Sequence, residues 1–438
     1  MKRFAPFALL ALLAPLLLFA RPAGAETVAL VGGTVHTLGV AGSLEAATVV
    51  IADGRIAAVG RDLEVPAGAR TVDVTGKVLT PGLVDSLTRL GLVEVSLVRG
   101  SRDQSVDDER VSAAFRVADA INPESTLFAI NRIEGLTRAV VAPDPGASLI
   151  AGQAALVHLG VPHAGAGDPV VQAPLALYAV LGEQGARHAG GSRAAALLAL
   201  REAFEDALDY AAHRDAWAGG ARRDYALSRL DLEALVPALT GPVEERLPFV
   251  VAVHRASDVL AALRLGEEYG LRLVLAGAEE GWRVADALAA ARVPVLLDPM
   301  ENLPASFDQL GSTLENAARL DAAGVPVAFA SGGAHNVRNL RQAAGNAVAH
   351  GMRWESALRA MTTTPARIWG MPDWGRIEAG YVADVVVWDG DPLEVTTFAD
   401  RVFIAGEEIE MESRQTLLRD RYMELPEEGD WPPAYEAP

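Results

Sequence analysis

Five polar residues of this 438-residue chain stand at or just after the ends of short apolar runs. They are Arg89, Tyr178, His254, Glu279 and His335. In α/β proteins the ends of parallel strands are where catalytic and binding side chains gather. A guanidinium is a good clamp for a carboxylate or phosphate, and an imidazole can move protons. These residue types predict a pocket for a small ligand.

The overall composition excludes several classes of protein. The formal net charge is -19, and such a surface repels nucleic acid and anionic lipid. The chain has no cysteine, which excludes disulfides and thiolate metal sites. After residue 25 the sequence contains one lysine, Lys77, so any chemistry that needs a lysine depends on that residue.

The first 25 residues have the pattern of a secretory signal peptide. Lys2 and Arg3 form a basic start, Phe7 to Phe19 is an apolar run, and Ala23-Gly24-Ala25 is a small-residue cleavage site. The alternative is an uncleaved anchor, but the run is short for a membrane-spanning helix, which needs about 20 residues. We expect a periplasmic or secreted protein with no membrane segment after cleavage.

The remaining chain changes pattern twice. Residues 26–80 are short β-branched runs separated by turn residues, which is typical of antiparallel hairpins. Residues 81–372 alternate short strands with longer helical stretches, which favours parallel βα units closed into a barrel. A helical insertion is expected at about 183–245. Strand patterns return over 373–412, and residues 413–438 form a C-terminal tail.

Three segments in order resemble one known group of proteins. Residues 76–85 read GKVLTPGLVD, residues 361–366 read MTTTPA, and residues 375–387 read GRIEAGYVADVVV. They resemble the amidohydrolase superfamily, and most of all its secreted, imidazolonepropionase-like branch. The resemblance implies a TIM (β/α)8 barrel plus a small β-sandwich built from both chain ends. It also implies hydrolysis of C–N bonds in cyclic amides or dipeptides, with one or two divalent metals, typically zinc, supplying hydroxide.

The chain departs from this family at the positions that should bind the metals. The first-strand motif Asp-x-His-x-His reads Asp85-Ser86-Leu87-Thr88-Arg89, so two histidines are replaced. Leucine cannot ligate a metal, and arginine has no free lone pair. The positions that match family metal ligands hold Leu87, Arg89, Tyr178, Ala252, Gly277 and Gly332.

One histidine is left near these positions. His254 lies two residues after Ala252 and faces the same way along a strand, so it is either a former ligand or a hydrogen-bonded pocket residue. A single imidazole would hold zinc too weakly to function. We therefore expect no metal cofactor, and no catalytic residue can be assigned.

Three functions follow as alternatives. The first is a metal-free pseudoenzyme that binds a small anionic ligand through Arg89, unless Arg89 pairs with a carboxylate such as Glu94 and fills the site. The second is a structural role as a homo-oligomer or as the partner of an active amidohydrolase paralogue. The third is a hydrolase with a rebuilt site, whose candidate nucleophiles and bases are Ser86, Thr88, Ser331, His254 and His335.

Overall fold

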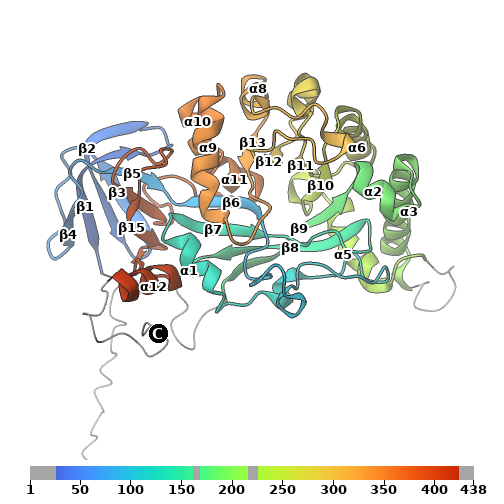
Figure 1. The fold of residues 1–438 in the computed structure, drawn as a ribbon, viewed down its shortest axis with the longest axis horizontal. Helices are drawn as coiled ribbons and strands as arrows, with labels where there is room; N and C mark the ends of the chain where they lie inside the picture. Colours follow the sequence, from blue (N-terminus) through green and yellow to red (C-terminus); the bar gives the residue numbers. More distant parts are fainter. Residues whose placement is uncertain (1–25, 161–167, 216–224, 424–438) are drawn as a thin grey trace, which may run out of the picture.

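The computed structural model describes residues 26–160, 168–215 and 225–423, and it contains two eight-stranded sheets (Figure 1). One sheet forms the barrel and the other stands at the side of it. The predicted signal peptide and the last fifteen residues of the predicted tail lie outside the described residues.

The barrel sheet follows the chain order of its strands. β6 and β7 pair in parallel, and the strands from β9 to β13 also pair in parallel. The predicted barrel is confirmed. The strands are β6 (Leu83–Thr88), β7 (Leu136–Val141), β8 (Ile150–His158), β9 (Val170–Val180), β10 (Phe249–Val253), β11 (Leu273–Gly277), β12 (Val295–Leu297) and β13 (Val327–Phe329).

β8 differs from the parallel pattern that the sequence predicted. It pairs antiparallel with both β7 and β9, and sequence analysis did not identify it as a strand. Its residues are rich in alanine and glycine, which have low strand propensity. All but the last of them are buried, so the segment shows no polar alternation that would have marked it.

Contacts after β13 bring the two edges of the barrel together. The Gly332 N–H donates to the Leu87 carbonyl at 2.9 Å, and the Arg89 N–H donates to the Gly333 carbonyl at 2.8 Å. The Asp85 carboxylate accepts the Ser331 N–H at 3.2 Å. Strand β6 is thereby joined to the segment after β13 at the carboxyl ends of both strands.

Helices cover the outside of the barrel, as Figure 1 shows. α2, α3 and α5 lie in the segment predicted as a helical insertion, and none of the helices of the described residues is long and apolar enough to cross a bilayer. The helices are α1 (Thr126–Arg132), α2 (Gly182–His188), α3 (Arg193–Ala212), α5 (Arg229–Leu239), α6 (Ala256–Tyr269), α7 (Ala285–Ala291), α8 (Asn316–Ala322), α9 (Leu340–Ala349), α10 (Trp354–Arg359), α11 (Thr363–Ile368) and α12 (Arg414–Met423).

The second sheet is built from both chain ends, as predicted. β5 pairs antiparallel with β14, and buried Trp388 donates its indole N–H to Thr80 Oγ1 at 2.9 Å. The strand order is β16-β15-β14-β5-β1-β2-β3, with β4 beside β1. The strands are β1 (Val28–His36), β2 (Ser43–Ala52), β3 (Arg55–Gly60), β4 (Arg70–Asp73), β5 (Val78–Pro81), β14 (Val385–Trp388), β15 (Ala399–Ile404) and β16 (Glu407–Glu408).

A buried ion pair joins the two sheets. Arg138 on β7 binds Asp384, just before β14, through Nε–Oδ2 at 2.7 Å and Nη2–Oδ1 at 3.3 Å. Both side chains are less than a tenth exposed. The Arg138 guanidinium also lies 3.6 Å from the centre of the Trp374 ring, so charge and stacking together fix the barrel against the sheet.

Candidate functional site at the mouth of the barrel

A cavity of about 340 Å³ opens at the carboxyl ends of the barrel strands. Its floor is apolar and its rim is polar. The floor residues come from alternate positions of several strands, as expected for side chains that fill a barrel. They include Leu87, Tyr178, Ala252, Ala276 and Leu296.

The cavity collects nearly all the residues that sequence analysis selected. The positions matching family metal ligands all line it: Leu87, Arg89, Tyr178, Ala252, Gly277 and Gly332. His254 and Glu279 line it too. His335 does not, because its Nε2 lies 2.9 Å from the backbone carbonyl of Glu94, and that contact holds it in the loop after β13.

His254 and Glu279 form the central polar pair of the cavity. His254 Nδ1 lies 2.5 Å from Glu279 Oε2, and Glu279 is buried. Burial lowers the pKa of His254, but the hydrogen bond and charge of Glu279, with Asp308 and Glu301 behind it, outweigh burial and raise that pKa above its usual value. The carboxylate therefore orients the ring and favours imidazolium.

The same pair explains why position 277 is glycine. Gly277 has φ +86°, and a Cβ there would lie 2.6 Å from His254 Nδ1 and 3.2 Å from Glu279 Oε2. The space beside β11 that a ligand histidine would need is taken by the ring of His254. The departure from the family pattern at Gly277 is thus coupled to the new pair.

The Arg89 guanidinium is not free to bind an anion, because groups of the chain already accept its hydrogen bonds. Its Nε donates to Asp144 Oδ1 at 2.5 Å and its Nη1 donates to the Thr88 carbonyl at 3.0 Å. Its guanidinium carbon lies 6.0 Å from the centre of the Tyr178 ring. The predicted pairing of Arg89 with a carboxylate occurs, but the partner is Asp144, and the suggestion of Glu94 was wrong.

Two carboxylates that sequence analysis missed complete the rim. Asp298 and Glu301 follow β12 and line the cavity. Burial raises the pKa of Asp298, and Glu279 raises it further. Burial also raises the pKa of Glu301, with Asp298 and Glu279 adding to the effect. A sequence signal was available, since Asp298 directly follows the apolar run that forms β12 and ends at Leu297.

A third carboxylate lies just beneath the mouth. Asp85 is fully buried, and burial raises its pKa to about 7 despite hydrogen bonds from Ser331 and Leu87. It is the residue that the first-strand motif retains. Because it joins β6 to the segment after β13 and does not line the cavity, its role here is structural.

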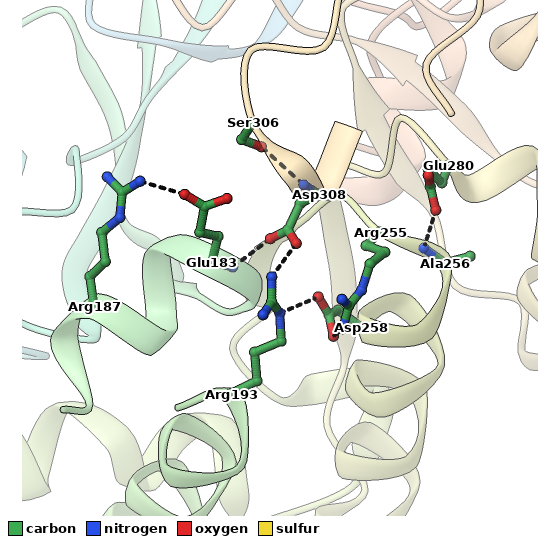
Figure 2. A network of polar contacts seen from close by, with 9 residues as sticks. All are labelled: Glu183, Arg187, Arg193, Arg255, Ala256, Asp258, Glu280, Ser306 and Asp308. Carbon is green, nitrogen blue, oxygen red and sulfur yellow. Dashed lines mark hydrogen bonds and ion pairs between the residues drawn. The ribbon is translucent and has the colours of Figure 1, made fainter. Parts of the chain in front are cut away.

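Figure 2 shows a network of polar contacts around Asp308, which lies in the same loop after β12 as Asp298 and Glu301. Asp308 is almost fully buried and accepts hydrogen bonds from the Glu183 N–H and from Arg193. Arg193 also binds Asp258 at 3.1 Å. This ties the start of α2, α3 and α6 to the rim of the cavity.

Glu280, the neighbour of Glu279 in the chain, belongs to this scaffold. Its Oε1 accepts the Gly311 N–H at 2.9 Å and its Oε2 accepts the Ala256 N–H at 3.1 Å. Both oxygens are used by backbone amides, so Glu280 positions the rim loop and the start of α6 (Figure 2).

The donor set of the mouth does not fit the metals of the resembled family. Among the described residues, no group of three or more histidine and carboxylate side chains is arranged to hold a metal ion. His254 is paired with Glu279, and the matching strand positions carry side chains without a suitable lone pair or no side chain at all.

Comparison with known proteins agrees with the fold. Residues 270–409 match the model of the amidohydrolase family. The amidohydrolase tasK of Hapsidospora irregularis is 26% identical over 372 residues, which are 78% of this chain and 37% of that protein. This chain therefore spans little more than a third of that relative's length.

Solved structures give the same result. An amidohydrolase from Thermotoga maritima MSB8 has a TM-score of 0.77 and 26% identity, covering 87% of this chain and 99% of that one. Molinate hydrolase is similar in fold alone, with a TM-score of 0.52 and 19% identity over 89% of this chain and 95% of that one. Together the matches show that the chain has the fold of the amidohydrolase superfamily and that its residues 270–409 are similar in sequence to that family.

Proposed function

We propose that the barrel mouth binds a small molecule with a positively charged group, and that it does so without the metals of the superfamily. The observation that carries the proposal is the charge of the rim. Asp298 and Glu301 line the cavity, and neither has an ion pair within the described part of the chain. Arg89 and His254, the cations of the cavity, are each paired with a carboxylate.

The raised pKa values of Asp298 and Glu301 support this charge preference. Two carboxylates in a partly dry cavity repel each other, and a cation between them relieves both burial and repulsion. An anionic ligand, which Arg89 suggested, would have to displace Asp144 from the guanidinium. The apolar floor under the rim suits a hydrocarbon portion of the ligand.

Hydrolysis without metal is the second candidate. C–N bond hydrolysis is the reaction that the resemblance implies, and the His254–Glu279 pair has the geometry of an oriented general base. Ser331 lines the same cavity. Above the raised pKa of His254, the neutral imidazole takes a proton from water or from the Ser331 hydroxyl as that oxygen attacks an amide carbon, and it gives the proton to the nitrogen that leaves as the C–N bond breaks. Where Ser331 is the attacking group, water then hydrolyses the ester that forms.

A structural partner remains a further proposal, in the periplasmic location that the first 25 residues suggest. The loop over the cavity exposes several large apolar side chains, and such patches favour protein contacts. They are Leu303, Phe307 and Leu310. A second copy or an active paralogue seated there would cover the mouth.

Titration calorimetry of the purified chain with small alkylamines and with carboxylates of the same size tests the proposal. We expect saturable binding of amines and none of carboxylates. Glu301→Gln should weaken amine binding about tenfold, since a charge-assisted contact contributes on the order of 1.5–3 kcal/mol. The matched control is Glu315→Gln, which removes an exposed carboxylate at the start of α8 that does not line the cavity.

Two results would overturn it. Tighter binding of carboxylates than of amines would show that the mouth prefers an anionic ligand. Equal amine binding by wild type and Glu301→Gln would show that the rim carboxylate does not contact the ligand. Chromatographic detection of products from dipeptides or cyclic amides, lost in His254→Gln, would favour the hydrolase instead.

A further inference from the structure

A second cavity lies on the opposite face of the barrel. It measures about 540 Å³ and sits between α11 and the segment that leads into the second sheet. Ile368, at the end of α11, accepts a hydrogen bond from Arg272, which directly precedes β11. The residues around it therefore stand at the amino ends of the barrel strands, whereas the mouth lies at their carboxyl ends.

The charge of this cavity is opposite to that of the chain. Three arginines line it, Arg359, Arg367 and Arg376, and no carboxylate does. An adjoining cavity of about 350 Å³ shares Arg367, adds Arg272 and Arg292, and again has no acidic residue in its lining. Five guanidinium groups thus converge on one face of a protein whose net charge is -19.

Most of the donors in the first cavity are available. Arg367 is exposed and has no ion pair or hydrogen bond within the described residues. Among the described residues, Arg376 makes a 3.3 Å contact to the Tyr381 hydroxyl, lies 5.8 Å from the centre of that ring, and makes a loose 3.6 Å contact to Glu378. Arg359 uses Nε and Nη2 on exposed Glu355, which leaves its Nη1 free.

Hydroxyl groups and an aromatic ring add to this set. Thr363 and Thr364 line the cavity and are half-buried, and their hydroxyls have no hydrogen bond among the described residues. Trp374 forms one wall and is fixed from behind by Arg138. Guanidinium groups with neighbouring hydroxyl donors match the acceptors of a phosphate or carboxylate group.

We propose that this cavity is a binding site for a small oxyanion, either free phosphate or the phosphate or carboxylate group of a small metabolite. The site is independent of the barrel mouth, and each takes a ligand of opposite charge. A bound oxyanion would accept hydrogen bonds from guanidinium groups that line the cavity and would neutralise their charge. Exposed Glu355 and half-buried Glu378 are the groups with which the ligand would compete.

The test is titration of the full chain with inorganic phosphate, pyrophosphate and citrate at constant ionic strength. We expect saturable binding of at least one of them. Arg367→Gln should weaken it about tenfold or more, since one charge-assisted pair is lost. Arg99→Gln, which removes the same charge from a side chain 87% exposed elsewhere, should bind like wild type.

Because Arg367 is exposed and unpaired, Arg367→Gln is expected to fold normally, which circular dichroism checks. Absence of saturable binding of all three probes would overturn the proposal. So would an equal loss in Arg99→Gln, because that result would mean general charge attraction only. Binding of pyrophosphate or citrate without phosphate would keep the site and identify a larger ligand.

Discussion

The two faces of the barrel use charge in opposite ways. At the mouth, each cationic side chain pairs with a carboxylate, Arg89 with Asp144 and His254 with Glu279. The carboxylates on the rim of the cavity have no ion pair within the described residues. On the opposite face, Arg367 has no carboxylate partner in the described chain and Arg376 only a loose one. In the amidohydrolase superfamily the reaction takes place at the mouth, yet in this chain the arginines with the fewest partners lie on the opposite face.

This difference shows how a barrel can change its site while keeping its fold. The strands and their ends still bring the same positions together, because backbone pairing sets them. The two cationic side chains at the mouth, Arg89 and His254, are each paired with a carboxylate of the chain. We infer that binding at each face is decided by the charge left after internal pairing rather than by the residue types that are present.

The largest effect is expected at the junction beneath the arginine-rich face. Arg138→Met leaves the buried Asp384 carboxylate without its partner, which should lower the free energy of unfolding by about 3–5 kcal/mol. Urea denaturation measures this. Adding Asp384→Asn should recover much of the loss, since the unpaired charge is gone. A single variant as stable as wild type would contradict the role of the pair.

The next effect concerns Asp85 and pH. Its folded-state pKa of about 7 lies above the unfolded value of 3.8, so the folded chain keeps a proton that the unfolded chain releases. This contribution to stability is largest at low pH and is lost as pH rises to about 7. Between pH 5 and 7, wild type should lose about 2–3 kcal/mol relative to Asp85→Asn.

Denaturation of both chains across that range measures the difference, and Asp62→Asn on the exposed surface is the control. Parallel pH profiles of wild type and Asp85→Asn would show that the carboxyl is ionised throughout. In that case the negatively charged carboxylate of Asp85 would lie beneath the mouth. The mouth would then be even more acidic relative to the arginine-rich face.

The smallest of these effects tests whether the metal site can be restored. Gly277→His puts a side chain at φ +86° against the ring of His254, and we expect about 2 kcal/mol of destabilisation. Elemental mass spectrometry after growth with zinc should find near-zero metal in both wild type and variant. One equivalent of zinc in the variant would show that the His254–Glu279 pair yields to a ligand.

Sequence analysis selected positions that the fold brings to one cavity, but it could not show how their charges are paired. The strand-end positions from Leu87 to Gly332 could be found because strand patterns and motif spacing mark them. The partner of Arg89 could not, since Asp144 is 55 residues away and only the closed barrel brings the two together. His335 was selected by type, and its contact with Glu94 removes it from the cavity.

The sequence by itself determined the barrel with its two-ended sheet and the residue types at the ends of its strands, because these depend on local pattern and residue identity. Only the tertiary structure decided which charges cancel. Pairing energies depend on distances and burial between residues far apart in the chain. The acidic mouth and the arginine-rich opposite face therefore became visible only in the folded chain.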